Sequence, residues 1–219
     1  MNDLLKRFKF FTIFYLLIFI LNIVVLYYIR DYRMVAKPMI MGSLIGLYIG
    51  NIVKQSPVFL MGMVFGLMGD IFLMVEDEMF FIIGLGSFLL MQVMYSVGFY
   101  KDVRINWKQD WIPVVVIYAI GLLFFAVVAG SLGSLLWPVF LYMLAITTMV
   151  CAAWLRDRSI VWYREVVAGA VLFLISDAFL GLSKFGVIGS SHSGAVVMIT
   201  YMMAQYLIVR GIVERDVDG

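Results

Sequence analysis

The chain has few residues of the kinds that bind metals or form disulfides. Its single cysteine, Cys151, excludes an internal disulfide and a thiolate metal cage. Its single histidine, His192, excludes a multi-histidine zinc site within one chain. We therefore expect neither a metal nor any other cofactor.

Charged residues are also scarce. They make up 14% of the chain, against about a quarter in water-soluble domains, and hydrophobic residues make up 64%. No basic patch with interleaved aromatic residues points to nucleic acid as a partner. This composition predicts a polytopic membrane protein. Because no region is long enough for a separate soluble domain, we expect residues 1–219 to form a single membrane domain.

A membrane-spanning helix needs about 20 mostly apolar residues, and eight segments of the chain meet that requirement. They are residues 9–29, 36–53, 58–76, 79–99, 111–130, 134–154, 163–183 and 193–212. The first is too long for the core of a signal peptide and no small-residue cleavage site follows it, which favours a retained span. We therefore predict an all-α transmembrane bundle of eight spans.

The distribution of basic residues indicates the orientation. With the N-terminus in the cytoplasm, most of them fall on the inner side, as the positive-inside rule requires. The inner set is Lys6, Arg7, Lys9, Lys54, Lys101, Arg104, Lys108, Arg156, Arg158, Arg164, Arg210 and Arg215, and the outer set is Arg30, Arg33, Lys37 and Lys184. We expect both termini in the cytoplasm, and we expect the membrane to be the cytoplasmic membrane of a bacterium.

Two aspartates lie inside otherwise apolar runs, Asp70 within residues 62–75 and Asp177 within residues 172–185. Each is followed at the same distance by Phe-Leu. An ionisable residue inside a span costs about 3 kcal/mol on insertion scales, so each needs a reason. Glycines at four-residue spacing share a helix face with each aspartate, namely Gly62 and Gly66 with Asp70, and Gly169 and Gly181 with Asp177. Small residues mark packed helix faces, so both aspartates are predicted to point into the bundle.

Three interpretations of this pair are open. Each aspartate could be a buried polar group that hydrogen-bonds to a neighbouring helix, or the two could form a proton or cation relay in a transporter. The third interpretation is a catalytic pair that works on a lipid. Two carboxylates close together in a low-dielectric site cannot both ionise easily, which leaves one acid and one carboxylate, the combination that acid–base hydrolysis uses.

Further polar residues could line a pocket beside the aspartates. They are Gln92 and Tyr95 in the fourth predicted span, and Thr200, Tyr201 and Gln205 in the eighth. Each is also typical of an ordinary interhelical hydrogen bond. Lys184 ends the seventh span about two turns after Asp177, at the outer interface. It fits an ordinary snorkelling lysine and a contact to the phosphate of a lipid headgroup equally well.

Three motifs carry a resemblance to a known family. They are GMVFGLMGDIFL at residues 62–73, GAVLFLISDAFLGLSKF at residues 169–185 and TYMMAQYLI at residues 200–208. Together with the length and the eight spans, they resemble the YhhN family, which includes the animal lysoplasmalogenases. Two positions depart from the family pattern. Gly66 stands where the family often has serine, and Gln92 stands in a segment where many members have Ala-His, which puts the choice of substrate in doubt.

The resemblance implies hydrolysis of the vinyl ether bond of a lysoplasmalogen, a membrane lysophospholipid, to a fatty aldehyde and a glycerophospho-base. It implies Asp70 and Asp177 as the acid–base pair, without deciding which of them is the acid. We assign the contact to the phosphate to Lys184, because of its place at the end of the seventh span. Many bacteria are not expected to make plasmalogens, so a bacterial member could act on another enol ether or lysolipid.

Two competing functions remain at this point. A small proton-coupled transporter or channel would use Asp70 and Asp177 as a proton relay and would depend on a gradient. An intramembrane aspartyl protease would carry Gly-x-Gly-Asp, but here Leu67 and Met68 separate Gly66 from Gly69. The chain also has no Pro-Ala-Leu motif near its C-terminus, which makes the protease the weaker alternative.

Overall fold

The computed structural model describes residues 2–52 and 55–218, and within these ranges it leaves the side chains of residues 2–8, 30, 190–192 and 216–218 undescribed. The side chains of Lys6, Arg7, Arg30, Lys54 and His192 therefore lie outside the described part of the chain. The described residues are helical, with no strand and one isolated bridge between Val103 and Arg156. The prediction of an all-α fold is confirmed.

Each of the eight predicted segments corresponds to a helix of 14 residues or more. These helices are α1 (Asn2–Tyr28), α3 (Pro38–Asn51), α4 (Pro57–Phe72), α5 (Glu78–Tyr100), α6 (Trp107–Val128), α7 (Leu136–Trp154), α8 (Tyr163–Lys184) and α9 (Ser190–Asp218). Short turns join some of them, namely η1 (Arg30–Tyr32), α2 (Arg33–Ala36), η2 (Ala129–Ser131) and η3 (Gly133–Leu135).

Six helices in the described part of the chain are long and apolar enough to cross a membrane, namely α1, α5, α6, α7, α8 and α9. The other two are shorter, with 14 residues in α3 and 16 in α4. The six long apolar helices make the chain an integral membrane protein.

Local sequence signals determine where several helices begin and end. Pro38 and Pro57 start α3 and α4, where a missing amide hydrogen does no harm. Asp77 caps α5, because its side chain accepts hydrogen bonds from the amides of Met79 and Phe80 at 2.8 and 3.2 Å. After α8 the chain turns at Gly186, whose φ of +74° is strained for other residues.

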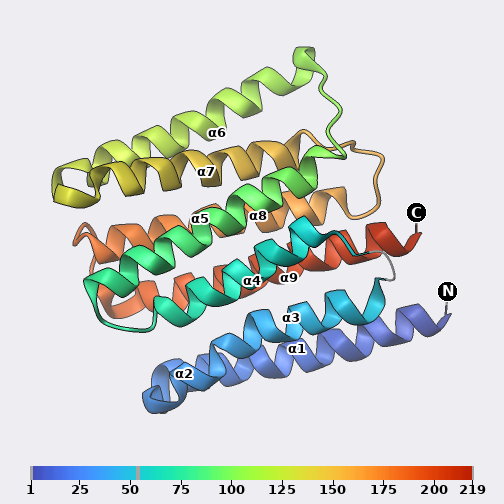
Figure 1. The fold of residues 1–219 in the computed structure, drawn as a ribbon, viewed down its shortest axis with the longest axis horizontal. Coiled ribbons are helices and arrows are strands. Elements are labelled where there is room, and N and C mark those ends of the chain that lie inside the picture. The colour runs from blue at the N-terminus through green and yellow to red at the C-terminus, as the bar shows by residue number, and fades with distance from the viewer. Residues whose placement is uncertain (1, 53–54, 219) are drawn as a thin grey trace.

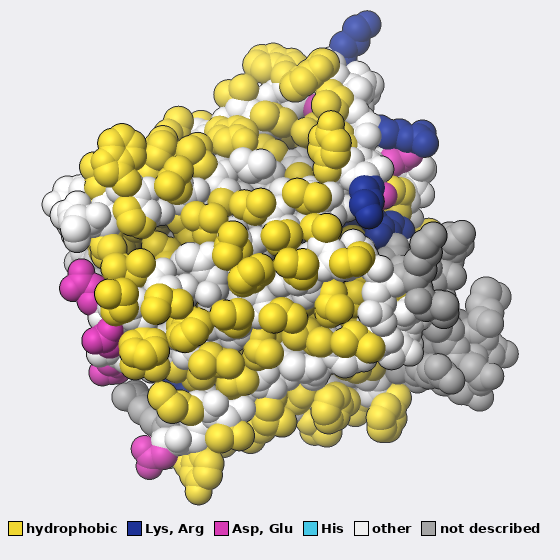
Figure 2. Space-filling view, in the orientation of Figure 1, with side chains coloured by type: hydrophobic (Ala, Val, Ile, Leu, Met, Phe, Trp, Pro, Cys, Tyr) yellow, Lys and Arg dark blue, Asp and Glu magenta, His cyan; other side chains and the backbone are white. Residues whose placement is uncertain are grey.

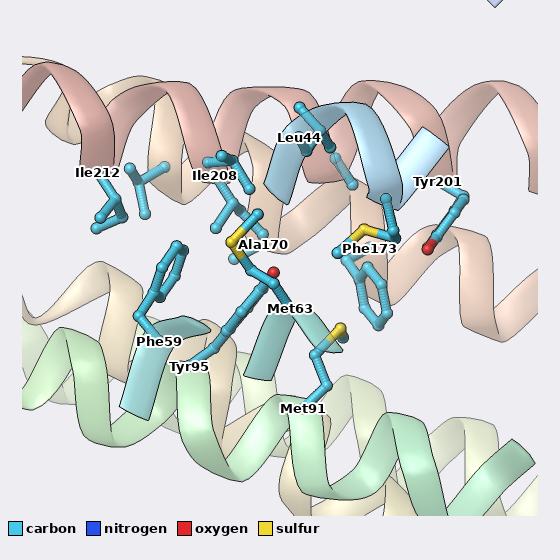
Figure 3. Packing of buried hydrophobic residues seen from close by; sticks show 14 of the residues in the cluster. Leu44, Phe59, Met63, Met91, Tyr95, Ala170, Phe173, Tyr201, Ile208 and Ile212 are labelled. Atoms are coloured by element: carbon cyan, nitrogen blue, oxygen red, sulfur yellow. The ribbon is translucent and has the colours of Figure 1, made fainter. Parts of the chain in front are cut away.

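The helices lie roughly side by side in the bundle (Figure 1). Helices α1 and α3 form one edge, α6 forms the opposite edge beside α7, and the N- and C-terminal ends lie on the same side. The hydrophobic core fills the space between α4, α5, α8 and α9, where Phe59, Met63, Met91, Phe173 and Ile208 meet (Figure 3).

Glycines let the central helices approach closely. A Cβ on Gly62 would lie 2.9 Å from the Tyr95 ring of α5, and one on Gly69 would lie 2.7 Å from the Phe88 ring. A Cβ on Gly169 would lie 2.8 Å from the carbonyl oxygen of Ala204 in α9. The predicted packed faces of α4 and α8 are therefore confirmed.

The surface separates into an apolar middle and two charged ends. Figure 2 shows hydrophobic side chains over most of the visible face, with Lys and Arg on the side of the termini and Asp and Glu prominent on the opposite side. Single apolar side chains are strongly exposed on the long helices, such as Leu123 at 67% on α6. A lipid environment satisfies such a surface, whereas water does not.

Candidate active site

A cavity of about 290 Å³ lies among α5, α6, α7 and α8. Its walls are apolar and aromatic except at three side chains, namely Tyr142 of α7 and Asp177 and Lys184 of α8. Ile120 of α6 and Ile175 of α8 line the cavity and are also exposed on the surface of the bundle, at 51% and 37%. The cavity therefore approaches the lipid-facing surface between α6 and α8.

Asp177 carries the only carboxylate among the described residues that line this cavity. The Tyr142 hydroxyl donates a short hydrogen bond to Oδ2 of Asp177, and Nε2 of Gln92 lies 3.5 Å from the same oxygen. Among the described side chains, none donates to Oδ1. Oδ1 is thus the carboxyl oxygen of Asp177 without a described donor.

Asp70 has a different environment. It is fully buried near the end of α4, where the Tyr201 hydroxyl of α9 donates a 2.6 Å hydrogen bond to its Oδ2. Nζ of Lys37, at the start of α3, lies 3.3 Å from its Oδ1. Asp70 is thus neutralised by a buried cation and does not line the cavity.

Aromatic side chains connect Tyr201, the hydroxyl partner of Asp70, to the wall of the cavity. Phe88 lines the cavity, and its ring centroid lies 6.0 Å from that of Tyr201, which holds Asp70. Phe173 packs against both rings, at 6.0 Å from Phe88 and 5.9 Å from Tyr201. Of the two aspartates, only Asp177 lines the cavity, and Asp70 reaches the cavity wall through Tyr201 and Phe88.

The two aspartates still influence each other electrostatically. The charge of Lys37 acts on both carboxylates, and the charge of Asp70 acts on Asp177. The two carboxylates differ in their direct partners. Asp70 pairs with the cation of Lys37, whereas Asp177 contacts the neutral hydroxyl of Tyr142 and the neutral amide of Gln92. A buried charge is tolerated when it is paired, so Asp70 is the better site for a permanent negative charge.

The structure brings three of the six predicted binding residues to the aspartates or the cavity. Gln92 approaches Asp177, Tyr201 donates to Asp70, and Lys184 lines the cavity. The other three do not reach them.

Tyr95 and Gln205 bond to each other at 3.2 Å in the core, where Tyr95 stacks on Phe59 at 4.6 Å. Thr200 donates to the carbonyl of Val196 in its own helix at 2.6 Å. These three residues therefore form ordinary structural hydrogen bonds and do not line the cavity.

Sequence reasoning missed Lys37 and Tyr142. The position of Lys37 directly before Pro38 suggested a residue at the membrane interface, but its side chain is only 13% exposed and reaches inward to Asp70. A lysine at the border of an apolar run that contains no other charge was a usable signal. Tyr142 lies in an apolar span, where a tyrosine is an ordinary core residue, so only its partner reveals its role.

Another group of charges lies at the opposite end of the bundle. Asp102, after α5, forms ion pairs with Arg156, after α7, at 3.1 Å and with Arg215 of α9 at 2.5 Å. The amide and hydroxyl of Ser159 donate to Asp157 and hold the pKa of that carboxyl below its usual value. These contacts tie the two connections α5–α6 and α7–α8 together.

Within the described residues, no group of three or more His, Cys, Asp or Glu side chains could hold a metal ion.

Comparison with known proteins identifies the family. The profile of the YhhN family matches residues 32–212. The chain belongs to the YhhN family. The matched region contains Lys37, Asp70, Tyr142, Asp177 and Tyr201, so every group that holds the two carboxylates lies within the YhhN region.

Several curated proteins of related sequence are named lysoplasmalogenases. "Lysoplasmalogenase TMEM86A" of Bos taurus is 30% identical over 158 residues, which are 70% of this chain and 64% of the bovine protein. "Lysoplasmalogenase" of Mycobacterium bovis is 27% identical over 143 residues, which are 60% of this chain and 50% of that protein. The chain thus spans about half to two thirds of the length of these relatives. No solved structure matches significantly.

Proposed function

We propose that this YhhN protein is an intramembrane hydrolase that cleaves the vinyl ether bond of lysoplasmalogen-type lysophospholipids. The observation that carries the proposal is a lone carboxyl group, Asp177, in the wall of an apolar cavity that approaches the lipid. The names of its relatives support the same activity. The products are a fatty aldehyde and a glycerophospho-base.

Asp177 is the general acid in this proposal. Its Oδ2 accepts from Tyr142 and Gln92, so the proton resides on Oδ1, the oxygen without a described donor. Asp70 stays ionised, because Lys37 and Tyr201 satisfy it. Asp177 has only neutral partners in an apolar surrounding, and burial disfavours its charged form, so in this proposal Asp177 keeps its proton until substrate arrives.

The reaction follows from this arrangement. Oδ1 of Asp177 transfers its proton to the β-carbon of the vinyl ether, and the electron pair of the double bond forms the new C–H bond. The oxygen lone pair stabilises the resulting oxocarbenium ion, and the new carboxylate of Asp177 lies beside that cation. Glycosidases use a carboxyl group beside a similar cation.

Water completes the cleavage. It adds to the carbon of the oxocarbenium ion while Asp177 takes up one of its protons, which gives a hemiacetal. Asp177 then returns that proton to the glycerol oxygen as the C–O bond breaks, and the hemiacetal hydroxyl loses its own proton to Asp177. The net reaction consumes one water and restores the acid.

In this proposal Asp70 is a positioning residue. Its ion pair with Lys37 and its hydrogen bond to Tyr201 join α3, α4 and α9. Tyr201 in turn packs against Phe88, which forms part of the cavity wall. Asp70 therefore acts on the reaction through its charge and through the shape of that wall.

We also propose that all eight of these helices, α1 and α3 to α9, cross the membrane with both termini in the cytoplasm. The placement of both ends on one side and the concentration of Lys and Arg on that side support this topology (Figures 1 and 2). The shorter α3 then crosses at one edge of the bundle beside α1, and α4 crosses in its interior. Asp70 and Asp177 lie toward the ends of α4 and α8 that face away from the termini, so the substrate comes from the outer leaflet.

A detergent assay tests the function. The purified protein is given lysoplasmenylcholine, lysoplasmenylethanolamine and the corresponding ester lysolipid, and fatty aldehyde is measured. We expect aldehyde from the two vinyl ethers without any ion gradient. A protein that releases none under these conditions, but moves protons across liposomes under a gradient, is a transporter.

A further inference from the structure

Lys184 occupies a distinctive place in the cavity. It is the last residue of α8 and the one basic side chain among the described cavity-lining residues. Its Nζ lies 4.8 Å from the centroid of the Phe81 ring, and the described residues give it no ion pair or hydrogen bond. A cation held over an aromatic face at a cavity wall can accept an anionic partner without breaking an existing ion pair.

The spacing between Lys184 and Asp177 is fixed by their common helix. Seven residues of α-helix advance by about 10 Å and return the side chain to nearly the same face. Both side chains line the same cavity, so they form two fixed points along one wall. The proton donor is at one point and the positive charge is at the other.

A vinyl ether lysophospholipid presents its reactive carbon and its phosphate at a similar separation. Seven bonds join the β-carbon of the vinyl ether to phosphorus, through the ether oxygen and the three glycerol carbons. At about 1.2 Å per bond, the advance of an extended polypeptide backbone, this path spans about 8 Å. The flexible lysine side chain covers the small remainder.

We propose that Lys184 binds the phosphodiester of the lysophospholipid headgroup and so places the vinyl ether at Asp177. This proposal rests on the proposed hydrolysis and names the residue that recognises the headgroup of the substrate. Lysine binds phosphate as a point charge, so the site selects for the phosphate and not for the choline or ethanolamine beyond it. The hydrocarbon tail then extends from Asp177 past Ile175 and Ile120 toward the lipid.

The alternative role of Lys184 is that of an ordinary interfacial lysine whose alkyl stem covers apolar surface. If Lys184 has only that role, its replacement changes the hydrolysis of substrates with the same tail equally, whether or not they carry a phosphate. Comparison of two substrates separates the roles, namely a 1-alkenyl-glycerophosphocholine and the matching 1-alkenyl-glycerol, which has the same vinyl ether and no phosphate.

The experiment measures aldehyde release from both substrates by the wild type, Lys184→Gln, Lys184→Arg and a control, Lys101→Gln. Lys101 is exposed after α5 at the opposite end of the bundle. We expect Lys184→Gln to lower the preference for the phosphate-bearing substrate, the ratio of the two kcat/KM values, by about tenfold, the size of one charged hydrogen bond. The loss should appear in KM. Lys184→Arg should retain most of the preference, and Lys101→Gln should retain all of it.

A second measurement guards against a general folding defect. Glycerophosphocholine, the phosphate-bearing product, should inhibit the wild type competitively and inhibit Lys184→Gln more weakly. Equal losses on both substrates, or unchanged inhibition by glycerophosphocholine, would overturn the role of Lys184 while the hydrolase assignment stands. A wild-type protein that releases no aldehyde from either substrate would overturn both.

Discussion

Nζ of Lys37 lies 3.3 Å from Oδ1 of Asp70 inside the bundle, where the carboxylate is fully buried and the lysine side chain is 13% exposed. The pair joins the start of α3 to the end of α4, and Tyr201 adds α9 through its hydrogen bond to the same carboxylate. Neither charge is tolerable there alone. The ion pair therefore fixes how these three helices meet.

Removing one member of the pair should destabilise the fold strongly. Lys37→Met leaves an uncompensated buried carboxylate, at a cost of about 3–5 kcal/mol. Thermal unfolding in detergent should show a large fall in Tm for this variant. The double variant Lys37→Met/Asp70→Asn should recover much of that loss, because its remaining groups are neutral. Additive effects of the two substitutions would contradict the pairing, and Lys101→Met serves as the surface control.

The helices and the burial of the two aspartates could be predicted from the sequence. The apolar runs determine where the helices lie, and the glycines spaced by four residues around Asp70 and Asp177 indicate that each points inward. The contacts of Gln92 and Tyr201 with the aspartates agree with their placement among the predicted pocket residues.

The absence of Asp70 from the cavity wall could not be predicted in this way. It depends on Phe88 and Phe173 packing around Tyr201, which is a property of three helices together. The inward position of Lys37 has the same origin, since hydropathy places a lysine beside a proline in a connection. Only the packing of α3 on α4 and α9 shows that this lysine has a buried partner.

Asp177→Asn should abolish aldehyde release. The amide retains the shape and can still accept from Tyr142, but it cannot donate a proton to carbon, so kcat should fall by a factor of about 10²–10⁴. Aldehyde release is measured together with Tm, which should change little. Asp31→Asn, at an exposed position in η1, is the matched control and should retain full activity. Near-normal turnover by Asp177→Asn would rule out Asp177 as the acid.

Asp70→Asn should also reduce aldehyde release, but through a different route. It leaves the positive charge of Lys37 without its anion and removes the charge that acts on Asp177. We expect a lower kcat together with a lower Tm, and Lys37→Met should partly restore both in the double variant. Loss of activity at unchanged Tm and without such restoration would instead indicate a direct catalytic role for Asp70.

Tyr142→Phe tests the hydroxyl that holds Asp177. The variant removes the hydrogen bond to Oδ2 and leaves the aromatic ring in the cavity wall. Asp177 then loses its orientation, and kcat should fall by about tenfold, as for the loss of one hydrogen bond to a reacting group. Tyr118→Phe is the matched control, because its hydroxyl bonds Thr148 at 2.9 Å between α6 and α7 and does not contact Asp177. Equal effects of the two substitutions would mean that the Tyr142 hydroxyl only stabilises helix packing.

Ala178→Phe tests whether the cavity holds the substrate. Ala178 follows Asp177 and lines the cavity, so a phenyl group there occupies the proposed tail site without displacing packed core. We expect kcat/KM to fall by about 10- to 100-fold, the range for a steric change in a hydrophobic pocket. Ala168→Phe places the same ring on an exposed position of the same helix and should leave kcat/KM unchanged. If both variants hydrolyse the lipid like the wild type, the substrate binds elsewhere, and the carboxyl group of Asp177 cannot be its proton donor.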